Sequence, residues 1–157
     1  MKHFLALIVF LAVAFAVAAF GAQFQPGEWY AVLEKPPWNP PNWVFGPVWT
    51  VLYVTIAVAA WLVWRRRGTG ERRARTRFAL GLWAVQLALN GLWSWLFFGL
   101  QRPGWALVDI VVLVIAIAWT ARAFHRLVPA AGWLLIPYLA WVAYATTLNG
   151  AICWLAR

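Results

Sequence analysis

Five long runs of apolar residues, each close to the length of a membrane-spanning helix, constrain the fold of this chain most. They cover residues 4–22, 43–64, 78–100, 105–124 and 132–156. The hydrocarbon core of a bilayer is about 30 Å thick, and an α-helix crosses it in about 20 residues. Backbone groups in hydrocarbon must pair within their own segment, and the runs lack the period-two alternation of a barrel strand. The sequence therefore predicts an all-α membrane protein, a bundle of five transmembrane helices.

The composition indicates that lipid surrounds most of the outer face. Hydrophobic residues make up 65% of the 157 residues and charged residues 11%, against about 45–50% and about 25% in soluble domains. A chain of this length leaves too much surface outside to hide that excess in a core. Short connections between the later runs place neighbouring helices antiparallel, so we expect one compact domain over residues 1–157.

The basic residues predict the orientation of the chain. The net charge is +9, but seven of the thirteen basic residues lie in one short stretch, residues 65–77, between two apolar runs. This pattern is typical of a cytoplasmic loop beside anionic lipid rather than of a nucleic acid-binding face, so no nucleic acid partner is expected. With five spans, ten of the thirteen fall on one side of the membrane. The positive-inside rule places the N-terminus and the arginine-rich loop in the cytoplasm.

The first run has an alternative interpretation as a cleavable signal peptide. Lys2 and His3 precede the apolar residues, and small residues follow at Ala19 and Gly21. These are the features of a secretory signal, but the run is long for its apolar region. The length favours a retained helix.

The first connection, residues 23–42, is rich in proline and aromatic residues. A short helix is expected after Pro26, and Pro36 and Pro37 should stop it. Residues 38–43 should run extended, because a residue that precedes proline avoids the α region. We interpret residues 23–42 as a lid over one end of the bundle, with an ordered interfacial connector as the alternative.

Fourteen tryptophans are the most unusual feature of the composition. Indole rings favour the headgroup level, and six of them lie near predicted helix ends: Trp29, Trp38, Trp43, Trp64, Trp105 and Trp133. Four lie further inside their runs: Trp49, Trp93, Trp95 and Trp141. Inward-facing rings would line a slot for a flat aromatic ligand, and stacking or edge contacts add about 0.5–1.5 kcal/mol each beyond burial.

Few polar residues lie within the runs. Gln86 and Asn90 are four apart and share a helix face, Asp109 is one turn into the fourth run, and Tyr138 belongs to a stripe on the fifth. Polar groups in lipid normally face the bundle interior. They would therefore form either interhelical hydrogen bonds or the polar end of a pocket; for Asp109, the closeness to the boundary favours a structural role.

The sequence contains no pattern typical of a conventional catalytic or metal site. No nucleophile lies with its base, no paired carboxylates occur, and His3 and His125 are isolated, so no metal site is expected. Small residues at helical spacing, Ala84, Ala88 and Gly91, would allow close helix packing either inside the bundle or across a homodimer.

Short motifs in the same order along nearly the whole chain resemble those of the translocator protein family, also called tryptophan-rich sensory proteins or peripheral-type benzodiazepine receptors. They are Trp29-Tyr30, Lys35-Pro36, Trp38-Asn39-Pro40-Pro41 with Trp43, Gly46-Pro47-Val48-Trp49 with Leu52-Tyr53, Gln86-Leu87-Ala88-Leu89-Asn90, Phe97-Phe98-Gly99, Gly104-Trp105-Ala106-Leu107-Val108-Asp109, Pro137-Tyr138-Leu139-Ala140-Trp141 and Ala145-Thr146-Thr147-Leu148-Asn149.

The resemblance implies a five-helix bundle, usually dimeric, that binds porphyrins such as protoporphyrin IX or heme between its helices under the first loop, with no required cofactor. It implies a sensing, transport or scavenging role. The pocket residues carried over by motif are Tyr30, Trp38, Trp49, Tyr53, Asn90, Trp93, Trp105, Asp109, Trp141, Ala145 and Leu148. The animal sterol motif is incomplete, because Gly150 and Ala151 stand where it places a tyrosine.

Two alternative functions remain open at this stage. Some family members are reported to degrade porphyrin in light, which would make Trp49 and Trp141 the redox candidates of an oxidative enzyme. The other alternative is a proton-coupled small-molecule transporter that uses Asp109.

Overall fold

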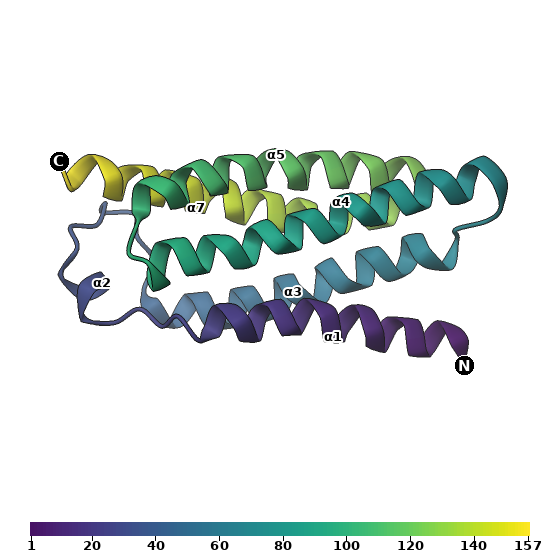
Figure 1. Ribbon diagram of the computed structural model, residues 1–157, viewed down its shortest axis with the longest axis horizontal. Helices are drawn as coiled ribbons and strands as arrows, with labels where there is room; N and C mark the ends of the chain where they lie inside the picture. The colour runs from purple at the N-terminus through teal and green to yellow at the C-terminus, as the bar shows by residue number, and fades with distance from the viewer.

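The computed structural model describes all 157 residues, and its long helices run side by side along one axis (Figure 1). Its five long helical segments are α1 (Lys2–Ala22), α3 (Asn42–Arg65), α4 (Gly70–Ser94) continued by the π-helix η1 (Trp95–Gly99), α5 (Pro103–Leu127), and α6 (Pro129–Leu134) continued by α7 (Ile136–Leu155). Each of the five is long and apolar enough to cross a membrane. The prediction of an all-α, five-span membrane protein is confirmed.

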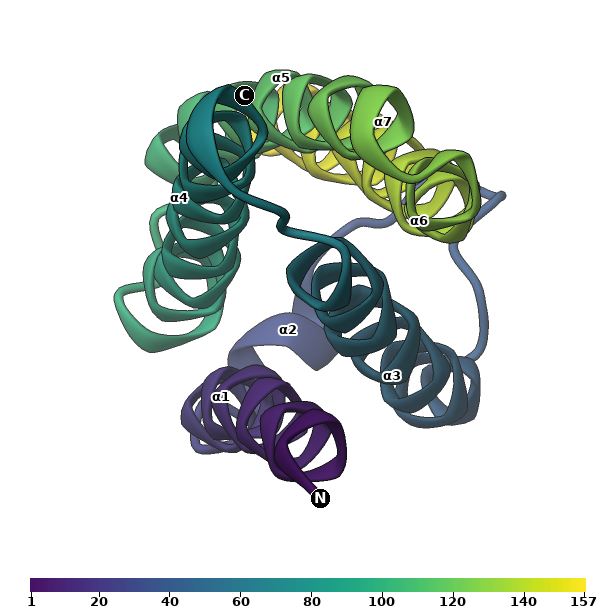
Figure 2. The ribbon, with the colours of Figure 1, turned by 90° about the vertical axis from the view of Figure 1, so that its right-hand side faces the viewer.

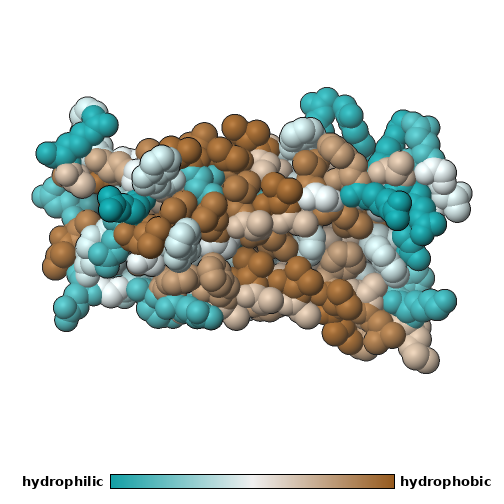
Figure 3. All heavy atoms as spheres, in the orientation of Figure 1, coloured by the Kyte–Doolittle hydropathy of each residue, from teal (hydrophilic) through white to brown (hydrophobic).

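The surface carries a wide apolar band between two polar ends. Figure 3 shows hydrophobic residues around the middle of the long axis and hydrophilic residues gathered at both tips. Large apolar side chains on the outer faces, such as Val111 and Ile115 on α5, are exposed. A bilayer covers such a band, so the long axis lies across the membrane.

Seen along this axis, the helices form a closed ring (Figure 2). Helix α1 contacts α3 and α4, α3 contacts α6, and α5 lies between α4 and α7. The core between them holds large buried side chains, among them Ile56, Phe124 and Tyr138. Helix α1 contributes one buried residue, Ala14, and is the least buried of the five spans.

The loop in the arginine-rich stretch, residues 65–77, is shorter than the sequence predicts. Helix α4 begins at Gly70 rather than near residue 78, so most of the stretch is helical. Apolarity marks only the lipid-embedded part of a helix, whereas arginine and alanine are good helix formers that continue it into the headgroup layer. Arg75 and Glu71 form an ion pair one turn apart, and Arg72 donates to the carbonyl oxygens of Arg66 and Leu127. The latter bond ties this end of α4 to the end of α5.

The fifth span is broken near its start. Helix α6 ends at Leu134 and α7 begins at Ile136, just before Pro137, which has no N–H to donate. The connection from α5 is reduced to Val128. Gly132 allows α6 to pack closely against the end of α5, because a Cβ at this position would lie only 2.5 Å from the His125 Cβ.

The small residues of α4 divide between two surroundings. Gly91 packs against Val17 and Phe20 of α1, where an added Cβ would lie 3.5 Å from each side chain. Ala84 and Ala88 lie on the outer face and are exposed. Packing inside the bundle thus accounts for Gly91 and leaves the other two on a free surface.

The lid contains the short helix expected between Pro26 and Pro36, α2 (Glu28–Val32). It lies at the same end of the bundle as the C-terminus, and the N-terminus and arginine-rich loop lie at the opposite end (Figure 1). Tyr30 of α2 is buried against Phe97 and Phe98 of η1, with ring centroids 6.3 and 5.5 Å away. The hydroxyl of Tyr144 on α7 donates to the carbonyl oxygen of Trp38, which fastens the other arm of the lid.

Candidate functional site

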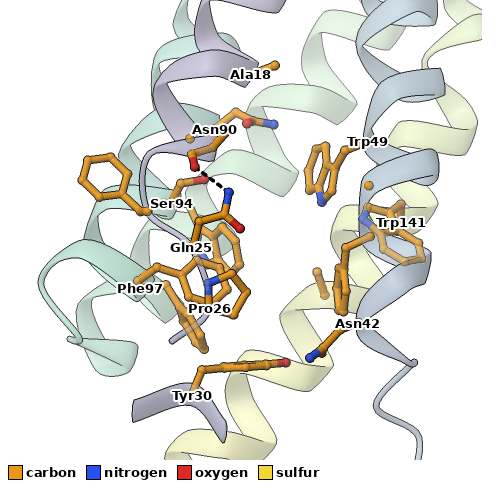
Figure 4. A pocket seen from close by; sticks show the side chains of 18 of the residues that line it. Ala18, Gln25, Pro26, Tyr30, Asn42, Trp49, Asn90, Ser94, Phe97 and Trp141 are labelled. Atoms are coloured by element: carbon orange, nitrogen blue, oxygen red, sulfur yellow. Dashed lines mark hydrogen bonds between the residues drawn. The ribbon is translucent and has the colours of Figure 1, made fainter. Parts of the chain in front are cut away.

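A cavity of about 560 Å³ lies beneath the lid, between α1, α3, α4 with η1, and α7 (Figure 4). Its size is within the range of about 300–1,000 Å³ that is usual for small-molecule pockets. Its walls come from helices far apart in the sequence. The lid supplies Gln25, Pro26 and Tyr30 at one end.

Aromatic rings make up much of the wall. Trp49 and Tyr53 of α3 have ring centroids 5.6 Å apart, and Phe45 meets Trp141 of α7 at 5.9 Å. On the opposite side, Trp93 stacks on Phe97 at 5.1 Å with an interplanar angle of 22°. Figure 4 shows Trp49 and Trp141 facing Phe97 across the cavity. Two aromatic walls of this kind suit a flat, apolar guest.

A chain of hydrogen bonds closes the deep end of the cavity. The Tyr53 hydroxyl donates to Asn90 Oδ1 (2.7 Å), Asn90 Nδ2 donates to the Tyr138 hydroxyl (2.9 Å), and that hydroxyl donates to Gln86 Oε1 (2.7 Å). The chain joins α3, α4 and α7. The polar residues therefore form interhelical hydrogen bonds and also the polar end of a pocket, because Tyr53 and Asn90 line the cavity as well.

A second polar link fixes Trp93. Its indole N–H donates to Asn149 Oδ1 (3.0 Å), and the Asn149 amide donates to the carbonyl oxygen of Pro103 (2.9 Å). This link connects α4, α7 and the start of α5. It holds the Trp93 ring in the orientation in which it stacks on Phe97.

Several buried polar atoms have no partner within the protein. The Trp141 indole N–H is one of them, and Trp141 lines the cavity. Gln86 Nε2 and both carboxylate oxygens of Asp109 are the others. A buried donor without an acceptor is costly in hydrocarbon, and a ligand acceptor beside Trp141 would remove that cost.

The cavity wall carries no side chain that is charged at physiological pH. None of its lining residues is Asp, Glu, Lys, Arg or His. Tyr30 is buried at the lid end; this burial raises the pKa of its hydroxyl, an effect partly offset by the hydrogen bond to Asn39. The phenol therefore stays protonated at physiological pH, and the cavity is neutral throughout.

Eight of the eleven residues expected at the site lie on the cavity wall. They are Tyr30, Trp49, Tyr53, Asn90, Trp93, Trp141, Ala145 and Leu148. The structure does not bring Trp38, Trp105 and Asp109 to the wall. Trp38 and Trp105 are 48% and 68% exposed on the outer surface, and Asp109 is buried in the bundle away from the cavity.

The wall contributed by α1 was not expected from the sequence. Phe15, Ala18, Gly21 and Ala22 line the cavity, yet the first apolar run carries no motif and no polar residue that would mark one face. The sequence did mark Phe97 and Phe98, since they belong to one of the family motifs. Their place under the lid depends on the π-helix, which hydropathy does not reveal.

Comparison with known proteins identifies the same family as the sequence motifs do. The model of the TspO/MBR family matches residues 5–155. The chain belongs to this family. It is 47% identical to the translocator protein of Homo sapiens over 132 residues, which is 82% of this chain and 77% of that protein.

Bacterial relatives match over a longer part of the chain. The chain is 43% identical to the tryptophan-rich protein TspO of Chlorobaculum tepidum over 154 residues, 96% of each chain. It is 44% identical to the tryptophan-rich sensory protein of Cereibacter sphaeroides over 142 residues, 90% of this chain and 85% of that protein. Family and structure together make it an integral, multi-pass membrane protein.

Proposed function

We propose that the protein is a membrane receptor or carrier that binds a porphyrin or related tetrapyrrole in the cavity beneath the lid. Protoporphyrin IX and heme are the candidate ligands, and the role is sensing, transport or scavenging. The observation that supports this most is the neutral, aromatic-walled cavity of about 560 Å³. Such a cavity favours a large planar guest with an apolar face.

The expected binding energy comes mainly from the rings. Each favourable aromatic contact adds about 0.5–1.5 kcal/mol beyond the burial of apolar surface. Trp49, Trp93, Trp141 and Phe97 offer such contacts on two sides of the cavity. Together they would give useful affinity without a charged group on the wall.

The names of the relatives support a receptor role. The bacterial relatives are named as tryptophan-rich and sensory proteins, and the mammalian ones as translocator proteins. A ligand-dependent membrane receptor or carrier is consistent with both. The chemical identity of the ligand in this chain is the part that the experiment below tests.

Quenching of tryptophan fluorescence tests the proposal directly. Purified protein in detergent is titrated with protoporphyrin IX, and binding should quench the fluorescence saturably. Trp141→Ala should weaken binding about tenfold or more, since it removes an aromatic contact and an unpaired donor. Trp133→Ala is the matched control, because this indole of α6 is exposed and lies at the end of the fifth span opposite the lid. Equal affinities in the two variants would contradict the cavity as the binding site.

An oxidative enzyme is the second candidate, and one observation favours it. Trp49 and Trp141 both line the cavity, so a bound pigment would contact oxidisable indoles. The protein–protoporphyrin complex is illuminated in air and pigment loss is followed by absorbance. Loss that is faster than for free pigment, and that slows in the Trp49→Phe, Trp141→Phe double variant, would support this activity. Loss at the rate of the free pigment would exclude it.

The proton-coupled transporter is tested at Asp109. This carboxyl is buried without a hydrogen-bond partner and lies away from the cavity wall. Uptake of porphyrin into proteoliposomes with and without a pH gradient is compared between the wild type and Asp109→Asn. Gradient-dependent uptake that is lost in Asp109→Asn would support the role, and undiminished uptake would exclude it.

A further inference from the structure

The neutral cavity poses a specific problem for a ligand that carries carboxylates. A carboxylate in a low-dielectric site needs hydrogen-bond donors or a cation, because leaving it unpaired costs several kcal/mol. No cation lines the cavity. Any carboxylate of the bound ligand must therefore lie at an end of the cavity where donors and positive charge are within reach.

The lid end has these features and the deep end does not. At the deep end, the hydroxyl of Tyr53 and the amide of Asn90 are already engaged in short hydrogen bonds. At the lid end, the Tyr30 hydroxyl makes one long bond of 3.4 Å to Asn39 Oδ1, and the Asn42 side chain makes no hydrogen bond within the protein. Figure 4 shows the Tyr30 hydroxyl and the Asn42 side chain pointing toward each other beside the cavity.

The lid carries a single cation, Lys35, which lies over the ring of Tyr30. The Lys35 ammonium lies 4.7 Å from the centroid of the Tyr30 ring, and Tyr30 lines the cavity. Its hydrogen bonds go to backbone carbonyl oxygens, those of Leu33 (3.1 Å) and Ala31 (3.4 Å). It forms no ion pair, since the ion pair of this structure joins Glu71 and Arg75 at the other end of the bundle. The charge of Lys35 is thus not neutralised.

The start of α3 adds to the positive potential at this end. Asn42 and Trp43 belong to the first turn of α3 and line the cavity. No side chain caps the N-terminus of this helix. The unpaired N–H groups of a first turn carry partial positive charge and favour a nearby anion.

We infer that the lid end of the cavity is a carboxylate-binding subsite in which the Tyr30 hydroxyl and the Asn42 amide donate to a ligand carboxylate and Lys35 supplies its counter-charge. This inference rests on the proposed function, and it sets the orientation of the ligand. The apolar face of the ring system lies between the tryptophans, and its acidic substituents point toward the lid. A lysine side chain is flexible enough to carry its ammonium from the ring face of Tyr30 to the ring edge, where the hydroxyl lies.

Because the lid also carries two acidic residues, carboxylate binding at this end depends on Lys35. Glu28 and Glu34 are exposed, and they would repel an anionic ligand that approached the lid. Lys35 is half-buried and is held over a ring of the cavity wall. Recognition of a carboxylate at this end therefore depends on this one ammonium group rather than on the charge of the lid as a whole.

The test compares protoporphyrin IX, whose propionate side chains are ionised, with its dimethyl ester, which has the same ring system and no charge. Dissociation constants for both compounds are measured by tryptophan quenching on the wild type, Lys35→Gln and Arg102→Gln. Arg102 is the control, because the connection between η1 and α5 to which it belongs is at the same end of the bundle as the lid (Figure 1) and the residue does not line the cavity.

Lys35→Gln should bind the diacid about three- to tenfold more weakly and should bind the ester as the wild type does. Retained ester binding also shows that the variant is folded. Arg102→Gln should leave both constants within about twofold. Asn42→Leu should resemble Lys35→Gln in direction, with a smaller loss.

Three results would overturn the inference. They are an equal change for both compounds in Lys35→Gln, no change for either, or a selective loss in Arg102→Gln instead. In all three, quenching that depends on Trp141 would still support the proposed function. Wild-type protein that binds neither compound would refute the proposed function and the carboxylate subsite together.

Discussion

Removal of one hydroxyl group, in Tyr138→Phe, tests whether the polar chain at the deep end stabilises the bundle. The Tyr138 side chain is fully buried, and its hydroxyl both accepts from Asn90 and donates to Gln86. The substitution keeps the ring and leaves the Asn90 amide donor and the Gln86 acceptor without this partner, and both residues are buried. Gln86 would be affected most, because its Nε2 already has no partner.

The expected loss follows from these two bonds. Hydrogen bonds between transmembrane helices contribute about 0.6 kcal/mol on average and up to about 1.7 kcal/mol each. The variant should therefore lose about 1–3 kcal/mol of stability. For a chain of this length, that corresponds to a decrease in Tm of about 3–10 °C.

Thermal unfolding in detergent, followed by near-UV circular dichroism, measures this loss. Tyr144→Phe is the matched control, since its hydroxyl donates to the carbonyl oxygen of Trp38 at an exposed site on the same helix. That variant should change stability by less than about 0.5 kcal/mol. A Tm of Tyr138→Phe equal to that of the wild type, or a loss no larger than in Tyr144→Phe, would refute the reasoning.

The remaining predictions concern packing, association and orientation. Gly132→Ala should lower the Tm by more than Tyr138→Phe does, because the added Cβ would collide with the Cβ of His125. A Tm within about 1–2 °C of the wild type, which corresponds to a stability change of about 0.5 kcal/mol, would contradict this. We propose that the exposed small-residue face of α4 forms a homodimer, so Ala88→Phe should shift chemically cross-linked protein in membranes from dimer to monomer, and unchanged cross-linking would exclude this face. We also propose that the N-terminus is cytoplasmic: in a Cys153→Ser background, a membrane-impermeant maleimide added outside intact cells should label Glu34→Cys and not Thr69→Cys, and the reverse pattern would invert the topology.

The parts of the fold that depend on contact with lipid are the ones that the sequence predicts well. Apolar runs mark where a helix lies in hydrocarbon, and all five spans follow from them. Helix ends in the headgroup layer have no such constraint. Gly70 therefore starts α4 well before the apolar run, and the kink ahead of Pro137 interrupts a run that looks continuous.

The site could be predicted only where a residue is distinctive by itself. Tryptophans within the runs and the polar pair of α4 are rare in lipid, and Trp49, Trp141 and Asn90 lie on the cavity wall. Ala18 and Gly21 look like any other residues of an apolar helix, and only the position of α1 in the ring makes them part of the wall. Trp105 shows the opposite case, in which a residue of a matching motif faces outward.

The π-helix η1 gives this region an unusual sensitivity to chain length. Its defining bond runs from the Leu100 N–H to the Trp95 carbonyl oxygen, five residues back (2.7 Å), so the turn holds one residue more than an α-helical turn. Deleting a single residue there would restore regular α-helical winding and change which side chains of this turn face the lid. Phe97 and Phe98 would then no longer both face Tyr30, although the hydropathy profile would hardly change. An insertion or deletion at this point of a homologue thus indicates that the contact between η1 and Tyr30 of the lid has changed. A comparison of substitutions alone would overlook this change.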